Sequence, residues 1–77
     1  MTNINYYNSK VGENAKQIIN QKGLKQCVVA KKAGYTPQTL NDMLNSRQIM
    51  KAVDIENIAK VLNVEVNELF GIKKEGA

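Results

Sequence analysis

The most informative part of this 77-residue chain lies at residues 26–44, which read QCVVAKKAGYTPQTLNDML. An apolar stripe around Ala30 predicts a helix of about eight residues. Gly34 ends this helix, since glycine readily takes the left-handed conformation that closes a helix. Thr36 and Pro37 predict a new helix start, because threonine caps free backbone donors and proline presets φ at the first helical position. The segment therefore predicts two short helices joined by three residues.

The second of these helices, about residues 36–44, has one apolar and one polar side. Its apolar side repeats at helical spacing through Leu40, Met43 and Leu44. Its outer side is polar and consists of Gln38, Thr39, Asn41, Asp42 and Asn45. Ala30 is small enough to let the two helices cross closely. A glycine-containing turn followed by a helix with a polar outer face is typical of the helix-turn-helix, whose second helix enters the major groove of DNA.

Apolar residues also recur at helical spacing on both sides of this segment. An amphipathic helix is predicted from about Ser9 to Lys22, ending at Gly23. A fourth helix is predicted between Ala52 and Leu62, and a short fifth one between Val66 and Phe70. Residues 45–50 are predicted to form a loop. The fold class is therefore all-α, a compact bundle of five helices.

Length and composition indicate a single small domain. A chain of 77 residues buries only about 60% of its unfolded surface, so the core must be compact. We expect a flexible N-terminal arm over residues 1–8, a folded domain over residues 9–70 and a tail over residues 71–77. The single cysteine, Cys27, has neither a second thiol nor a histidine to pair with, which fits a packing role in a reducing cytoplasm. We expect neither export nor membrane insertion, because no apolar run approaches the ~18 residues that span a bilayer.

Basic residues gather in the middle of the chain. The net charge is +4, but residues 22–51 hold six basic residues against Asp42 alone. Residues 52–77 hold three basic and five acidic residues. This polarity predicts one surface of positive potential, which attracts polyanions such as nucleic acid.

From Val11 to Phe70 the chain resembles the Cro- and phage-repressor-like, or xenobiotic-response-element, helix-turn-helix proteins. The matching stretches are Gly23-Leu24-Lys25-Gln26, Ala30 to Leu40, Ile58 to Val64 and Asn67-Glu68-Leu69-Phe70. The resemblance implies a bundle of the lambda-repressor-like type. It also implies a bacterial or phage-encoded transcriptional regulator, a repressor, that binds palindromic operator DNA as a homodimer. With no room for a separate dimerisation domain, we expect the dimer to form around the fifth helix and residues 64–72.

The resemblance also implies which residues touch DNA, with the helix at about residues 36–44 in the major groove. Base edges are expected to meet Gln38, Thr39, Asp42, Pro37 and Asn41. Phosphates are expected to meet Gln26, Lys25, Thr36, Asn45, Ser46, Arg47 and Lys51, with backbone N–H groups of the loop among the donors. Two questions stay open. Asp42 either accepts from cytosine N4 or holds a neighbouring side chain. Lys25 and Lys51 either give up a helix cap for DNA contact or lie just outside the helix starts.

Other function classes receive less support from the sequence. The chain has no histidine, no base for Cys27 and no glycine-rich phosphate loop, so we expect no enzyme activity, metal, cofactor or small-molecule ligand. A protein-binding adaptor or antitoxin-like module remains the alternative, with Ile49 and Met50 as its only hint unless they complete the core. We expect Tyr6 and Tyr7 to pack on the domain or on a second subunit, since a minor-groove arm normally uses Arg or Lys.

Overall fold

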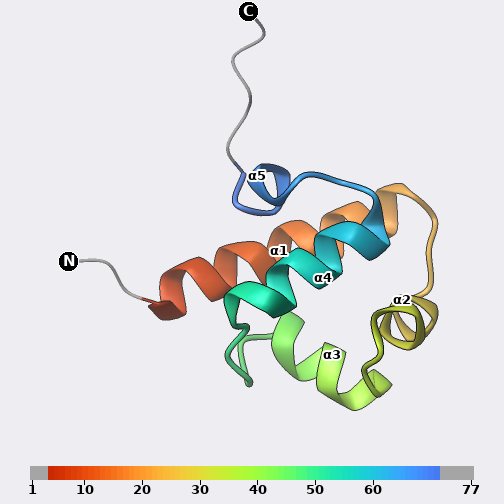
Figure 1. Ribbon diagram of the computed structural model, residues 1–77, viewed down its shortest axis with the longest axis horizontal. Helices are drawn as coiled ribbons and strands as arrows, with labels where there is room; N and C mark the ends of the chain where they lie inside the picture. Colours follow the sequence, from red (N-terminus) through yellow and green to blue (C-terminus); the bar gives the residue numbers. More distant parts are fainter. Residues whose placement is uncertain (1–3, 72–77) are drawn as a thin grey trace, which may run out of the picture.

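The computed structural model describes the backbone of residues 4–71 and the side chains of residues 7–71. It contains five helices, namely α1 (Ile4–Gln21), α2 (Gln26–Ala33), α3 (Pro37–Leu44), α4 (Ala52–Leu62) and α5 (Val66–Leu69). α1 and α4 form the middle of the molecule, with α2 and α3 on one side of them and α5 on the other (Figure 1). The predicted all-α bundle of five helices is confirmed.

One apolar core holds the helices together. Every helix contributes its apolar stripe, and the buried side chains are Val11, Ala15 and Ile19 of α1, Val29 and Ala30 of α2, Leu40, Met43 and Leu44 of α3, Ile55, Ile58, Ala59 and Leu62 of α4, and Leu69 of α5. Met50 joins the core from the loop before α4, whereas its neighbour Ile49 is 53% exposed. Of the two residues that hinted at a protein-binding surface, only Ile49 is therefore available for one.

The start of α1 differs from the sequence prediction. The helix begins at Ile4 and not near Ser9, so residues 4–8 are helical. This additional part of the helix makes a long-range contact that helical periodicity does not reveal. Asn8 is buried against Met50, whose backbone N–H donates to Asn8 Oδ1 and whose carbonyl accepts from Asn8 Nδ2 at 3.5 Å.

The prediction that Tyr6 and Tyr7 pack on the domain or on a second subunit can be checked for only one of the two residues. The ring of Tyr7 packs edge-on against Phe70, with ring centroids 6.2 Å apart, which confirms that Tyr7 packs on the domain. The side chain of Tyr6 lies outside the described residues, as do residues 1–3 of the expected arm and 72–77 of the expected tail.

Gly12 allows α1 to cross the end of α3 at backbone contact. A Cβ atom at this position would overlap the carbonyl oxygen of Leu44. α1 is thereby held directly against the point where α3 ends and the following loop begins.

The turn between α2 and α3 forms as the sequence predicts. Gly34 has a φ of 83°, and the N–H of Tyr35 donates to the carbonyl of Ala30 at 2.9 Å. The hydroxyl oxygen of Thr36 accepts from the N–H of Thr39 at 3.1 Å, and Pro37 occupies the first helical position. The local signals therefore fix both ends of the turn.

α4 braces this turn through two further hydrogen bonds. Asn57 Nδ2 donates to the carbonyl of Ala33 at 2.7 Å. The hydroxyl of Tyr35 donates to Asp54 Oδ1 at 2.6 Å. Burial, and then the bond to Asp54, raises the pKa of Tyr35 above its ordinary value.

None of the helices within residues 4–71 combines the length and the apolar character needed to cross a membrane.

Candidate nucleic-acid interface

α3 presents its polar side outward, as the sequence predicts. Its apolar residues are buried, while Pro37 and Gln38 are exposed and Thr39 is half-buried at the surface. Asn41 and Asp42 are also half-buried. The surface of α3 that faces away from the core thus consists of hydroxyl, amide and carboxylate groups with one proline ring.

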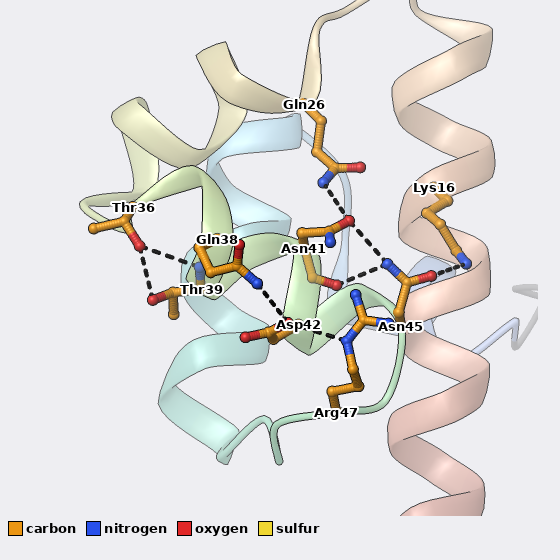
Figure 2. A network of polar contacts seen from close by, with 9 residues as sticks. All are labelled: Lys16, Gln26, Thr36, Gln38, Thr39, Asn41, Asp42, Asn45 and Arg47. Carbon is orange, nitrogen blue, oxygen red and sulfur yellow. Dashed lines mark hydrogen bonds and ion pairs between the residues drawn. The ribbon is translucent and has the colours of Figure 1, made fainter.

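One cluster of polar contacts joins α3 to the loop that follows it. Asp42 Oδ1 accepts from Gln38 Nε2 at 3.0 Å and from Arg47 Nε at 3.1 Å (Figure 2). The side chain of Arg47 is 61% exposed and that of Asp42 is 26% exposed. Asp42 therefore holds two neighbouring side chains, which was one of the two alternatives that the sequence left open. A surface ion pair of this kind adds little to stability, but it does fix where the side chains lie.

A second cluster joins α1, α2 and α3 on the same surface. Asn41 Oδ1 accepts from Gln26 Nε2 at 3.3 Å and from Asn45 Nδ2 at 2.9 Å. Asn45 Oδ1 in turn accepts from Lys16 Nζ at 3.1 Å (Figure 2). The expected phosphate residues Gln26 and Asn45 are thus brought together by Asn41, which was itself expected to meet a base.

Sequence reasoning missed Lys16 as a member of this site. It lies on α1, and its ammonium group sits beside Asn45, which is 29 residues further along the chain. Nothing in the sequence of the first predicted helix indicates that Lys16 lies beside Asn45. Only the packing of α1 against the end of α3 brings its charge to the polar side of α3.

The backbone amides of the loop after α3, which were expected among the phosphate donors, already have partners in the protein. The backbone N–H groups of Asn45, Ser46 and Arg47 donate to the carbonyls of Asn41, Met43 and Asp42 at 3.0, 3.3 and 2.7 Å. These bonds close the C-terminal end of the helix, with Ser46 in the left-handed conformation at a φ of 63°. These three amides are therefore satisfied within the protein, which leaves the side chains of the loop as its unused donors.

Lys25 and Lys51 occupy the N-cap positions of α2 and α4, as the sequence placed them. A lysine ammonium has only donors, so it cannot accept from the first amides of a helix. At the start of α4 the carboxylate of Asp54 accepts from the N–H of Lys51 at 3.0 Å, which makes up part of this loss. At the start of α2, where Lys25 is the N-cap residue, no side chain caps the helix. Cys27 lies in the first turn of α2 and is exposed, so the expectation of a packing role is wrong.

Charge is separated over the surface of the described residues. Exposed basic side chains lie on or next to the helix-turn-helix at Lys25, Lys31, Lys32, Arg47 and Lys51. The exposed acidic side chains of α4 and α5 are Glu56 and Glu68, with Glu65 at the start of α5. No group of histidine, cysteine and acidic residues between 7 and 71 could hold a metal ion.

Comparison with known proteins identifies the family. The sequence model of a helix-turn-helix family of the Cro and xenobiotic-response-element type matches residues 16–69, which include the whole of α2 and α3. No match is found among curated proteins. The match leaves residues 4–15 of α1 outside the family pattern, although they are part of the fold. Since the match covers most of the chain and contains the turn and the polar helix described above, the chain belongs to this helix-turn-helix family of DNA-binding regulators.

Proposed function

We propose that the protein is a transcriptional repressor that inserts α3 into the major groove of a palindromic operator. The observation that carries this proposal is the polar outer side of α3, which lies next to the half-buried Lys16 of α1 and the exposed Arg47 of the following loop. A major groove about 12 Å wide admits one helix, and lysine or arginine on both flanks can then reach the phosphates.

The base contacts would come from the outer side of α3. The amide of Gln38 can pair with adenine through two hydrogen bonds, and the methyl group of Thr39 can touch that of thymine. Pro37 adds a rigid apolar surface at the exposed start of the helix. Asp42 would accept from an exocyclic amino group. Asn41 is half-buried and its Oδ1 is occupied, so it would contribute through its Nδ2 group.

The phosphate contacts would surround this helix. Arg47 is the strongest candidate, because only its Nε is bonded to Asp42 and its terminal nitrogens are left for a phosphate. Lys16 joins the expected set of Gln26, Lys25, Thr36, Asn45, Ser46, Arg47 and Lys51. At α2, where no side chain caps the helix, Lys25→Ser should raise the free energy of unfolding by ~1 kcal/mol. The same variant should bind DNA more weakly and with a flatter salt dependence if Lys25 has traded a cap for a phosphate contact.

A homodimer would form through α5 and the connector before it. Val64 and Val66 are half-buried there and border an open cleft between α4 and α5 that also contains Val53. The alternative of a protein-binding adaptor rests on exposed apolar side chains, since Ile49 is 53% and Val53 is 67% exposed. Ile49 lies beside Ser46 and Arg47, so a partner bound there would compete with the proposed phosphate contacts, whereas Val53 borders the cleft near α5.

A salt titration by fluorescence anisotropy tests the DNA-binding proposal. The logarithm of the association constant should fall with the logarithm of salt concentration by about 0.9 per neutralised phosphate. Arg47→Ala should weaken binding to every duplex and flatten this slope. Gln38→Ala should instead reduce discrimination at one base pair by ~1–3 kcal/mol.

Lys60→Ala is the matched control for charge. It removes one positive charge from α4, where Lys60 lines the cleft near α5. This change can alter affinity through the proposed dimer, but it does not alter the number of phosphates that are neutralised. This variant should leave the slope unchanged. The proposal is wrong if no duplex binds even at very low ionic strength. The assignment of roles is wrong if Arg47→Ala and Gln38→Ala lose binding in the same uniform way.

A further inference from the structure

We propose that Asp42 determines which bases this protein reads, by fixing the orientation of Gln38 and by presenting a second acceptor to the neighbouring base pair. This inference rests on the proposed binding of α3 in the major groove. It adds a specific prediction about the operator, namely an adenine opposite Gln38 and a base with an exocyclic amino group, adenine or cytosine, opposite Asp42.

The chemistry of the cluster permits one orientation of the Gln38 amide. An ionised carboxylate has only acceptors, so the Gln38 group that faces Asp42 must be the nitrogen. The observed bond from Gln38 Nε2 to Asp42 Oδ1, at 3.0 Å, meets this requirement. The outer edge of the amide then carries Oε1 as an acceptor and the second N–H as a donor.

Arg47 fixes the carboxylate from the other side. Its Nε donates to the same Oδ1 at 3.1 Å, and its backbone N–H donates to the carbonyl of Asp42 at 2.7 Å. One carboxylate oxygen is therefore held between two donors. The other oxygen, Oδ2, points away from both partners (Figure 2) and has no hydrogen-bond partner among the described residues.

Gln38 Oε1, the second N–H of Gln38 and Asp42 Oδ2 are therefore free to contact base edges, and two of these three groups are hydrogen-bond acceptors. In the major groove adenine presents a donor at N6 and an acceptor at N7, which matches the outer edge of Gln38. Guanine presents two acceptors, O6 and N7, and so faces the Gln38 oxygen with no donor. Asp42 Oδ2 can accept from the amino group of cytosine or adenine, but it repels the keto oxygens of guanine and thymine. Gln38 and Asp42 lie one helical turn apart and can therefore face neighbouring base pairs.

Selection from a duplex library with a randomised core, followed by anisotropy measurements on single-base variants of the best site, tests the inference. The base pair whose discrimination is lost in Gln38→Ala should place its adenine toward the protein. Replacing that adenine with purine, which lacks the 6-amino group, should weaken wild-type binding roughly five- to hundredfold. Since every Watson–Crick pair contains either adenine or cytosine, the neighbouring pair is tested by removing its amino group in the major groove, which should weaken binding by the wild type but not by Asp42→Ala.

Variants of Asp42 distinguish its effect on the orientation of Gln38 from the effect of its own charge. Asp42→Ala should reduce discrimination at both base pairs, because Gln38 is then released, whereas Gln38→Ala should affect only one. The double variant Gln38→Ala/Asp42→Ala should discriminate at the pair read by Gln38 as well as Gln38→Ala alone does. Asp42→Asn should admit keto bases at the neighbouring pair, since an amide also donates. Glu56→Gln on α4 makes the same charge change at an exposed residue away from α3, and should leave discrimination unchanged.

The outcomes distinguish this inference from the proposed function. Selection of a G·C pair at the position read by Gln38 would overturn the inference while DNA binding stands. So would an Asp42→Ala variant that binds all duplexes more tightly through loss of repulsion and keeps full discrimination at the pair read by Gln38. Failure of every duplex to bind would overturn both.

Discussion

The contact between Asn8 and Met50 leads to the sharpest prediction from this structure. Asn8 lies on the part of α1 that precedes the family match, and Met50 closes the loop that carries Arg47. Both residues are buried, and the amide of Asn8 satisfies both backbone polar groups of Met50. Replacing Asn8 with alanine would leave the buried N–H of Met50 without a partner.

The size of the effect follows from that unsatisfied group. Leaving one buried backbone donor unpaired costs about 1–3 kcal/mol, a large part of the stability of a domain this small. Amide hydrogen exchange at Met50 should accelerate by about five- to 150-fold if the loop opens locally. If the opened loop must be ordered again on DNA, the cost of about 1–2 kcal/mol for one backbone residue weakens binding about five- to thirtyfold. The salt slope should not change, since Arg47 still reaches its phosphate.

Asn14→Ala provides a matched control on the same helix. Asn14 Nδ2 donates to the carbonyl of Leu69 at 2.7 Å, so it ties α1 to α5 rather than to the loop. We expect this variant to lose stability to urea, with Met50 exchange unchanged. Its affinity for a duplex that carries a single half-site should also be unchanged, because one half-site is bound without the proposed dimer surface at α5. Urea denaturation followed by circular dichroism, exchange measured by NMR and anisotropy with one duplex supply the three readouts.

Two results would refute this reasoning. Unchanged exchange at the Met50 amide in Asn8→Ala would show that Asn8 does not hold the loop. Equal losses of DNA affinity in Asn8→Ala and Asn14→Ala would show that the effect is one of general stability. The exchange measurement does not depend on DNA binding, so it tests the anchor even if the proposed function fails.

Three further predictions concern stability and are each measured by urea denaturation. Gly12→Ala should destabilise the fold by about 1–3 kcal/mol, because its Cβ would overlap the Leu44 carbonyl; a gain in stability, as at an exposed helix position, would contradict the close approach. Ser46→Gly should stabilise it by ~1 kcal/mol, since glycine adopts the positive φ without steric cost, and any loss would show that the serine side chain matters more than its backbone. The pKa of Tyr35 is raised above 10.0 by burial and by its bond to Asp54, so its contribution to stability is complete below pH 10 and is lost as the pH rises through the folded-state pKa; Tyr35→Phe should lack this part of the decline, and identical pH profiles would contradict it.

The sequence predicted those features of the fold whose causes are local. Gly34, Thr36 and Pro37 act on backbone groups within a few residues of themselves, so the turn and the start of α3 could be located from the sequence alone. The apolar stripes likewise identified the core, since helical spacing determines which side chains share a face. The polar outer side of α3 followed from the same spacing.

The parts that could not be predicted depend on contacts between distant residues. Asn8 and Met50 are 42 positions apart, and Lys16 and Asn45 are 29 apart. Neither asparagine nor lysine in an amphipathic pattern indicates a partner at such a distance. The loop after α3 is a different case, because its backbone amides donate to carbonyls only three to five residues earlier. Ser46 closes this helix end with a positive φ, which serine does not signal in a sequence as glycine does.

The N-terminal part of α1 therefore belongs to the functional unit, although the family pattern begins only at residue 16. Within residues 4–15, Asn8 holds the loop that carries Arg47, Gly12 fixes α1 against the end of α3, and Asn14 holds α5. These three contacts reach the proposed DNA-binding surface and the proposed dimer surface from a single rigid helix. A chain that began at residue 16 would keep every residue of the helix-turn-helix but would leave the N–H of Met50 unsatisfied and its loop free to move. The geometry of the proposed DNA-binding surface thus depends on a segment that the motif itself does not contain.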